Sequence, residues 1–592
     1  MHQGSPDALL AAIAQSGNET TQGWMRLMAG EPAGAGLPPW LAELQAGAAQ
    51  EGAHLAELQA AYLAKQTQLW STLVAGHAEG PGNAAPADRR FASGAWRENP
   101  YFDYLRRSYL LAAGYVEDLV EAAPLEPALK ERARFAARQW IAAMSPANFP
   151  ATNPEAIQKA LETGGESLTR GLAHLLEDAR KGRISQTDES AFEVGRNIAV
   201  TPGEVVYENE LIQLIQYAPA TAQVARRPLV VVPPCINKFY ILDLQPGSSL
   251  VEYAVAGGQS VFMISWRNAG TPIGHLGWDD YLEQGVFAAL RVAREIAGAD
   301  QVNALGFCVG GTLLGAALAV LAARGETPVA SATFLASMHD FREPGQLGLF
   351  IDEAGVAARE AAIGRNGILP GAELAFVFSS LRANDLIWPY VVNNYLKGER
   401  PPAFDLLYWN SDSTNLPGPM YCYYVRNMYL ENKLRVPGAL VNCGVPVDLG
   451  KVALPAFILA AREDHIVPWR SAYRSLGLLR GEKTFVLAAS GHVAGVVNPA
   501  TKNRRSYWTA KAAAAQIPTQ FPDDPDDWLA AADEHRGSWW PRWMDWLEAH
   551  SGGKRRAPVS AGTVQHRPIE PAPGRYVREP AAPRPAGAYE RT

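Results

Sequence analysis

The sequence predicts an α/β protein in which a mostly parallel sheet, covered by helices on both faces, follows a helical N-terminal region. Three observations lead to this prediction. Short β-rich runs alternate with helical segments beyond about residue 195, a glycine-flanked cysteine lies between one such run and an apolar helix, and the earlier residues have helical periodicity. With 592 residues, of which 48% are hydrophobic, the chain is long enough for two or three domains around a large core.

Residues 1–190 are expected to form a helical domain. Apolar residues recur there at steps of three, four or seven, first at Leu41, Leu44, Ala48, Leu55, Leu58, Tyr62, Leu69 and Leu73. After a break rich in Gly, Pro and Ala at 78–88, a second face runs from Phe102 to Leu119. We interpret this region as an accessory domain.

Residues 191–592 are expected to form the second domain. Its β-rich runs lie at 228–232, 260–266, 302–307, 330–335, 453–459 and 484–487. Helical segments such as 279–297 and 313–323 separate several of them, which favours a parallel sheet with helices on both faces.

Two stretches interrupt this pattern. The stretch at about 338–451 is too long for a structureless loop between two core strands, so it predicts a structured insertion. Its many Trp and Tyr residues favour a cap over an active site. From about 552 to 592 the chain is rich in Pro, Arg and Ala, which predicts an extended tail.

Charge and cysteine content exclude several classes of protein. The net charge of -7 gives no basic footprint, so nucleic acid is not an expected partner. The four cysteines form no C-x-x-C pair, which leaves a zinc site without support, and we expect neither a metal nor a cofactor. The N-terminal stretch lacks the basic region of a signal peptide, and no run of about 18 apolar residues is present to span a membrane. A cytoplasmic protein with free thiols is therefore expected.

The candidate nucleophile is Cys308. The segment GFCVG at 306–310 follows a predicted strand and opens an apolar helix, which is the context of the nucleophile elbow of the α/β-hydrolase fold, with Cys in place of Ser. The flanking glycines avoid collisions across a strained turn, and the amide of Val309 would then face an oxyanion. The alternative is a buried structural cysteine in a glycine-rich turn.

Asp464 and His492 complete a candidate triad. In α/β-hydrolases the nucleophile, the acid and the histidine follow one another along the chain, and Asp464 and His492 each come just after a late predicted strand. Asp464 could instead cap the next helix, and His492 could be an ordinary loop residue. His465 is a rival for the base, although its place directly beside Asp464 argues against it.

A cysteine at the elbow is itself informative. A thiol that exchanges with a thioester gives another thioester, so the acyl group keeps its reactivity, and the thiolate is a competent nucleophile beside a histidine. This choice favours acyl transfer from thioesters over hydrolysis of ordinary esters.

Several longer motifs resemble those of polyhydroxyalkanoate synthases, in particular the single-subunit, short-chain type called class I. The resemblance runs from about residue 90 to 575 and departs from the family at 337–340 (SMHD) and 342–344 (REP). The motifs are NPYFDYL at 99–105, NFPATNP at 148–154, PPCINKFYILDL at 233–244, GFCVGGT at 306–312, FDLLYWN at 404–410 and NLPGPMY at 415–421.

The resemblance implies the same triad, Cys308, Asp464 and His492, with the amides of Val309 and of Ile236 in the loop at Cys235 as oxyanion donors. It also implies substrate-binding positions in the cap. Arg382 would contact coenzyme A phosphates, or else form a salt bridge. Trp409 would contact substrate, or else only pack the cap. His465 is a further candidate for substrate binding, and Cys235 fits equally well as a small core residue.

The activity implied by the resemblance is polymerisation of (R)-3-hydroxyacyl-coenzyme A, 3-hydroxybutyryl-coenzyme A above all, with coenzyme A as the leaving group. It further implies a homodimer associated with the growing polyester chain and the polymer granule, to which the N-terminal region would offer a surface. A thioesterase or hydrolase on the same triad, and a non-catalytic granule-associated protein, are the alternatives.

Overall fold

The computed structural model describes residues 52–74, 88–511 and 521–581, which form two compact units. The first unit runs to Asp188 and also includes a later segment, Phe376–Pro402. The second consists of Glu189–Ala375 and Ala403–Ala582. The predicted apolar positions Leu41, Leu44 and Ala48, and most of the break at 78–88, lie outside the described residues.

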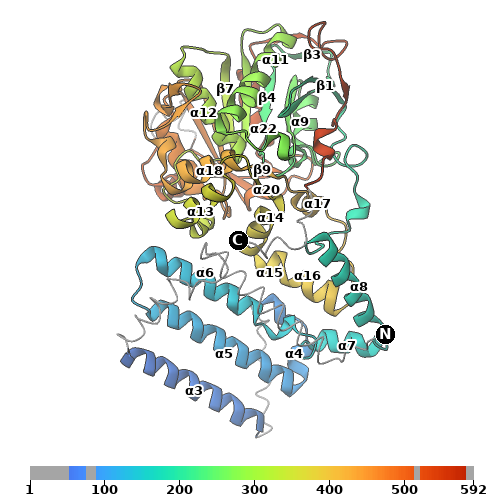
Figure 1. Ribbon diagram of the computed structural model, residues 1–592, viewed down its shortest axis with the longest axis vertical. Helices are drawn as coiled ribbons and strands as arrows, with labels where there is room; N and C mark the ends of the chain where they lie inside the picture. The colour runs from blue at the N-terminus through green and yellow to red at the C-terminus, as the bar shows by residue number, and fades with distance from the viewer. Residues whose placement is uncertain (1–51, 75–87, 512–520, 582–592) are drawn as a thin grey trace. The chain divides into compact units, whose positions relative to one another are not determined.

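The first unit is helical, as Figure 1 shows in blue and cyan. α3 packs on α5, where the ring of Tyr62 stacks on that of Tyr115 with centroids 4.5 Å apart. The predicted apolar face of α5 has other neighbours, because Phe102 and Tyr109 pack around Phe91 and Val116 packs with residues of α6. α5 begins at Pro100 because Asn99 accepts the N–H of Tyr101 and proline suits the first turn. The helices are α3 (Gly52–Val74), α4 (Ala95–Glu98), α5 (Pro100–Ala122), α6 (Pro127–Ala143), α7 (Pro154–Glu162) and α8 (Glu166–Lys181).

The segment Phe376–Pro402 lies within the stretch that the sequence assigned to the cap, yet it packs with the N-terminal helices. The hydroxyl of Tyr395 donates to Asp178 of α8 at 2.7 Å. The approach is so close that a Cβ at position 171 would lie 1.9 Å from the carbonyl oxygen of Tyr395, which requires Gly171. The segment holds the end of α14 (Gly371–Leu381), α15 (Ala383–Leu386), α16 (Trp388–Tyr390) and the π-helix η8 (Val391–Leu396).

The second unit is built on an 11-stranded mixed sheet with the order β15-β14-β13-β12-β7-β6-β4-β5-β2-β1-β17. Its centre, from β5 to β13, is parallel, and the strands on both sides are antiparallel. This arrangement confirms the predicted fold class. The central strands are β4 (Leu229–Val232), β5 (Val261–Trp266), β6 (Val302–Phe307), β7 (Val329–Leu335), β12 (Ala456–Ala461) and β13 (Lys483–Ala488).

The outer strands were not predicted. They are short or carry polar side chains, so they lack the continuous apolar runs of the centre. They are β1 (Gly203–Glu208), β2 (Ile212–Tyr217), β14 (Ser506–Thr509), β15 (Asp533–Arg536) and β17 (Glu570–Pro571).

Alternate side chains of the central strands enter two different cores. Val230 and Val232 pack with the helices on one face, and Leu229 and Val231 pack with those on the other. The first face is covered by the π-helix η6 (Tyr281–Phe287), α11 (Ala288–Ala297) and α12 (Val309–Ala323), and the second by α9 (Leu250–Ala256) and α22 (Trp540–Ala549).

The chain between β7 and β12 forms short helices joined by small β-pairs. Outside the segment that belongs to the first unit, Arg426 ties this region together through an ion pair with Glu360 at 2.6 Å. The main elements are α13 (Glu353–Ile363), β8 (Ile368–Leu369), α17 (Asp405–Ser411), β9 (Leu416–Pro417), α18 (Gly418–Tyr424), the π-helix η9 (Val425–Leu430), β10 (Val441–Asn442) and β11 (Val445–Pro446).

The described part of the C-terminal tail is extended and anchored to the sheet. β16 (Lys554–Arg556) pairs with β3 (Gln223–Ala225), and β17 pairs with β1. The turn η13 (Tyr576–Arg578) then buries Tyr576 and Val577. Among the described helices, none combines the length and apolar composition needed to cross a membrane.

Candidate active site

Cys308 occupies a sharp turn between β6 and α12, at the carboxyl edge of the parallel sheet. Its φ of 53° and ψ of -128° lie in a region that residues other than glycine rarely adopt. The Cys308 N–H donates to the carbonyl of Leu335 on β7 at 3.0 Å, which anchors the strained residue to the neighbouring strand. The partly buried thiol is thereby held at the strand end, where the sequence predicts a nucleophile.

The glycines around Cys308 are required by close backbone approaches. A Cβ on Gly306 would lie 2.4 Å from the Cα of Gly311, and one on Gly310 would lie 2.2 Å from the carbonyl oxygen of Val232. Both distances are shorter than non-bonded atoms allow. The second approach also shows that the chain leaving β4 packs directly against the turn that holds Cys308.

His492 is the first residue of α20 (His492–Val496), directly after β13. Its Nδ1 lies 2.6 Å from Oδ2 of Asp464, whose side chain is fully buried. Cys308 is also close enough to His492 to help raise the pKa of its imidazole. The structure therefore brings the three predicted residues together, in the chain order expected for this fold.

Asp464 uses its two carboxylate oxygens differently. Oδ1 accepts the N–H groups of Ile466 and Val467, each at 2.8 Å, and Oδ2 faces His492. The next helix, α19 (Trp469–Arg474), is preceded by Pro468, so Asp464 organises a turn and is not the cap of that helix. These contacts fix the carboxylate toward the imidazole.

The surroundings of His492 favour its charged form. Burial disfavours an imidazolium, but the Asp464 carboxylate and the Cys308 thiolate outweigh it through charge and hydrogen bonding, and hold the pKa of His492 well above its usual value. The imidazole also stacks on Phe307, with ring centroids 5.4 Å apart. A pair made of thiolate and imidazolium is the reactive form of a cysteine nucleophile.

The two predicted oxyanion donors follow two neighbouring strands of the sheet, β6 for Val309 and β4 for Ile236. Val309 is the first residue of α12, so its N–H is one of those that a helix leaves without an intrahelical acceptor. Ile236 lies in the loop after β4, which neighbours β6 in the sheet. The carbonyl of Ile236 accepts the N–H of Thr414 at 2.9 Å, so this loop is tied to the insertion.

Cys235, in the same loop, is buried in the core. Burial raises the pKa of its thiol far above the usual value, and the nearby Cys308 adds to this effect. A thiol in such a setting stays protonated and inert. The structure thus places Cys235 as a small core residue beneath the site.

The remaining predicted residues lie in different settings. Trp409 is buried, and its indole N–H donates to the carbonyl of Lys238 at 2.7 Å. Arg382 belongs to the first unit, where its half-exposed guanidinium forms an ion pair with Asp385 at 2.7 Å. His465 is half-buried beside Asp464, but the imidazole that bonds to that carboxylate is that of His492. Direct substrate contacts by Trp409, Arg382 and His465 stay predictions.

Two tyrosines that the sequence analysis did not single out lie close to the triad. Tyr424 and Tyr429 come from the insertion, their rings meet edge to face with centroids 5.4 Å apart, and both interact electrostatically with Cys308. Burial raises the pKa of both hydroxyls far above their usual value, and the nearby Cys308 adds to this effect. The aromatic content of the insertion was the sequence signal, but it did not indicate which rings reach Cys308.

Two family models match the chain. The model described as "Poly-beta-hydroxybutyrate polymerase (PhaC) N-terminus" matches residues 87–254, and the model described as "alpha/beta hydrolase fold" matches residues 228–499. The second match contains Cys308, Asp464 and His492.

Similar proteins of known name cover most of the chain. It is 52% identical over 557 residues to the "Poly(3-hydroxyalkanoate) polymerase subunit PhaC" of Cupriavidus necator, covering 93% of this chain and 92% of the relative. It is 45% identical over 499 residues to the "Poly(3-hydroxyalkanoate) polymerase" of Methylorubrum extorquens, covering 83% and 81% of the two chains.

Among solved structures, a monoacylglycerol lipase of Paleococcus ferrophilus matches 57% of this chain and 99% of its own, at 14% identity and a TM-score of 0.33. A TM-score this low supports no argument about function. The sequence relatives are decisive: with 52% identity over 93% of its length to one of them, this chain belongs to the poly(3-hydroxyalkanoate) polymerases, acyltransferase-type enzymes, and its second unit has the alpha/beta hydrolase fold.

Proposed function

We propose that this chain polymerises (R)-3-hydroxyacyl-coenzyme A, with 3-hydroxybutyryl-coenzyme A as the first substrate to test, through a covalent thioester on Cys308. Membership of the polymerase family supports the overall reaction. The observation that carries the mechanism is the strained Cys308 beside His492, whose Nδ1 is 2.6 Å from Asp464. No cofactor is needed beyond the coenzyme A thioester, which is the substrate.

In the acylation step, His492 holds Cys308 as a thiolate, which attacks the carbonyl carbon of the acyl-coenzyme A thioester. The negative charge that develops on the carbonyl oxygen is stabilised by the amides of Val309 and Ile236. The new bond between carbon and the Cys308 sulfur replaces the bond to the coenzyme A sulfur. The departing thiolate takes the proton that His492 carries.

In the elongation step, the 3-hydroxyl group of one acyl unit attacks the thioester carbonyl of another. His492 accepts the hydroxyl proton and passes it to the departing thiolate, so a C–O ester bond forms while a C–S bond breaks. Asp464 orients the imidazole and balances its positive charge. The product is longer by one ester unit.

The same proposal includes the setting of the enzyme. We expect a cytoplasmic homodimer at the surface of the polyester granule, as the family resemblance implies. Size-exclusion chromatography with light scattering, and fluorescence microscopy of a tagged chain in polymer-accumulating cells, test the two statements separately.

The decisive experiment measures coenzyme A release from 3-hydroxybutyryl-coenzyme A and isolates the product. We expect release of coenzyme A together with a polyester that remains attached to Cys308 until late in the reaction. Free 3-hydroxybutyrate in an amount equal to the coenzyme A released would establish a thioesterase instead. Granule binding without coenzyme A release would establish a non-catalytic granule protein.

A further inference from the structure

Lys238 is a buried lysine that the proposed chemistry does not use. It lies in the loop that carries Ile236, and only 3% of its surface is exposed. Its ammonium group donates to the backbone carbonyl of Glu579 at 2.6 Å. Burying an ammonium group is unfavourable unless its hydrogen bonds and charge are compensated, so an apolar residue would fill this space more easily. A lysine at this position is best explained by the hydrogen bond that its ammonium group forms with the C-terminal tail.

The charge around Lys238 has the sign that such a buried cation needs. Burial lowers the pKa of its ammonium group, while the carboxylates of Asp412 and Glu579 oppose that effect and favour the charged form. Asp412 also accepts a hydrogen bond from the hydroxyl of Tyr240 at 2.7 Å. Lys238 therefore stands where the loop after β4, the insertion and the C-terminal tail meet.

The backbone of the same loop is held by the insertion. The indole of Trp409 donates to the carbonyl of Lys238 at 2.7 Å, and the N–H of Thr414 donates to the carbonyl of Ile236 at 2.9 Å. Asn237 forms an isolated bridge with Ser413. The backbone of this loop is thus fixed from one side by the insertion, and its lysine side chain is fixed from the other side by the tail.

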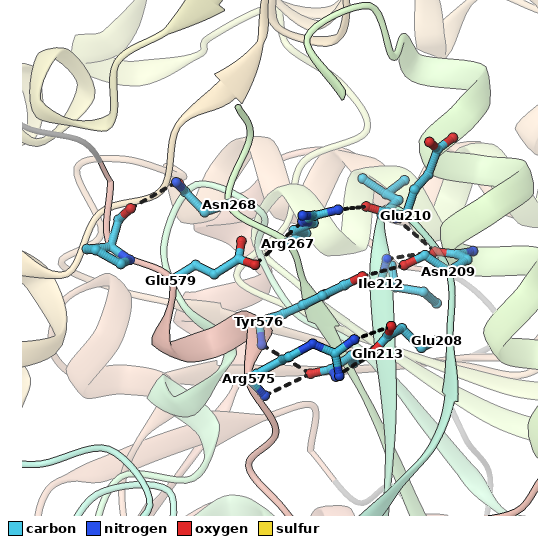
Figure 2. A network of polar contacts seen from close by, with 12 residues as sticks. Glu208, Asn209, Glu210, Ile212, Gln213, Arg267, Asn268, Arg575, Tyr576 and Glu579 are labelled. Carbon is cyan, nitrogen blue, oxygen red and sulfur yellow. Dashed lines mark hydrogen bonds and ion pairs between the residues drawn. The ribbon is translucent and has the colours of Figure 1, made fainter. Parts of the chain in front are cut away.

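The partner of Lys238 belongs to a C-terminal strap, residues 569–580, that is docked on the sheet. The buried side-chain carbonyl of Gln213 accepts the backbone N–H groups of Arg575 and Tyr576, both at 3.1 Å, as Figure 2 shows. The hydroxyl of Tyr576 donates to the carbonyl of Asn209 at 2.7 Å. The strap is therefore held through its backbone and the Tyr576 side chain, in one position along β2.

The end of the strap is held by the loop after β5. Arg267 lies over the ring of Tyr576, 5.1 Å from its centroid, and forms a long ion pair of 3.5 Å with Glu579. The amide of Asn268 donates to the carbonyl of Pro580 at 3.1 Å, and its oxygen accepts the N–H of Asn415 at 2.9 Å. In Figure 2, Asn268 points to the strap, whereas Arg267 lies between Glu579 of the strap and the backbone carbonyl of Glu210. The carbonyl that Lys238 uses is therefore fixed in space.

We propose that the C-terminal strap, acting through Lys238, is a positioning element that fixes the loop carrying Ile236 and so sets the geometry of the second oxyanion donor. This inference rests on the proposed acyl transfer at Cys308, including the proposed role of the Ile236 amide. The Val309 amide is fixed by the turn and helix that hold Cys308, whereas the Ile236 amide lies in a loop and depends on what holds that loop. A displaced donor stabilises the developing negative charge less well.

The test compares two reactions of Cys308, one with an oxyanion and one without. Transfer from 3-hydroxybutyryl-coenzyme A passes through a tetrahedral oxyanion. Alkylation by iodoacetamide displaces iodide at a saturated carbon and needs only the thiolate and His492. We expect Lys238→Met to lower kcat for coenzyme A release by roughly tenfold to a hundredfold, no more than the loss of an oxyanion donor itself. KM should change much less, and the alkylation rate of Cys308, followed by peptide mass mapping, should stay as in the wild type.

Two further variants make the test complete. Arg267→Gln loosens the strap from a half-exposed position, so it should fold normally and lower kcat by about two- to fivefold, the range expected for one weak surface contact. Lys554→Met makes the same chemical change at an exposed lysine of β16, and it should behave as the wild type.

The outcomes separate the strap from the chemistry. Loss of kcat with unchanged alkylation in Lys238→Met supports the inference, and a smaller loss of the same kind in Arg267→Gln supports it independently of how Lys238→Met folds. Wild-type kcat in both variants would refute it, as would an equal fall of kcat and alkylation rate in either, because that indicates general damage. If the wild-type chain itself released no coenzyme A, the proposed function would fail, and not only the role of the strap.

Discussion

Replacing Asp464 by Asn changes which proton His492 carries, and the structure fixes the direction of the change. Oδ1 of Asp464 accepts two backbone N–H groups, from Ile466 and Val467, each at 2.8 Å. In the variant, the amide oxygen keeps those contacts, so the NH2 group must face Nδ1 of His492, where Oδ2 now lies at 2.6 Å. The imidazole is then held with its proton on Nε2 and cannot accept one from the thiol or from a hydroxyl group.

The magnitude has a lower and an upper bound. The lost hydrogen bond to a charged group contributes about 1.5–3 kcal/mol, roughly a 10- to 150-fold change in rate, and the wrong tautomer of the imidazole extends the loss to about 10⁴-fold. A thiol is partly ionised near neutral pH and needs less help than a hydroxyl group, so the full effect is expected in elongation and a smaller one in acylation.

A single-turnover experiment with labelled 3-hydroxybutyryl-coenzyme A measures both steps. In Asp464→Asn we expect label on Cys308 at a moderately reduced rate, while chain extension stalls. Asp448→Asn is the matched control. The Asp448 carboxylate also accepts a backbone N–H in a turn, that of Gly450 at 2.9 Å, but Asp448 has no part in the proposed triad. Equal losses in acylation and elongation would refute the special role in elongation, and no loss in either would remove Asp464 from the triad.

Changes at three further residues test the site and its support. Cys308→Ala should abolish coenzyme A release in the same assay and Cys308→Ser should be severely impaired, because a hydroxyl group is a poorer nucleophile toward thioesters at neutral pH; activity that survives Cys308→Ala would point to another nucleophile. His492→Gln should slow alkylation of Cys308 by iodoacetamide at pH 7, since the imidazolium that favours the thiolate is gone; unchanged alkylation would make His465 the next candidate for the base. Burial lowers the pKa of His339 to about 4, so the folded state binds fewer protons than the unfolded state below the usual value of 6.5. The free energy of unfolding should therefore fall by up to about 3 kcal/mol as the pH drops from about 6.5 to 4, because the unfolded state gains a proton that the folded state does not bind. Urea denaturation should show a smaller fall in His339→Gln. Parallel pH curves for the two proteins would contradict this.

The sequence determined the central sheet and the candidate triad because both depend on local pattern. The parallel strands are buried on both faces, so each appears as a short apolar run, and β6 lies where the sequence predicted it. Pro455, which has no N–H for the ladder, precedes β12, and this strand starts at Ala456, later than the predicted 453. Cys308, Asp464 and His492 could be chosen because each follows a strand of this kind, and strand ends of a parallel sheet meet at one edge.

Only the tertiary structure decided the features that depend on distant partners. The outer strands, such as β15 with the sequence DEHR, carry no apolar pattern and form because β14 offers its free edge. The segment Phe376–Pro402 joins the N-terminal helices through contacts such as Tyr395 with Asp178, which are far apart along the chain. Lysine is usually found on the surface, so nothing in the sequence indicates that Lys238 is buried. Its burial depends on the folded chain, in which the strap binds its ammonium group. Burial and pairing of this kind are properties of the assembled fold, since they depend on partners in other elements, 217 positions away for Tyr395 and 341 for Lys238.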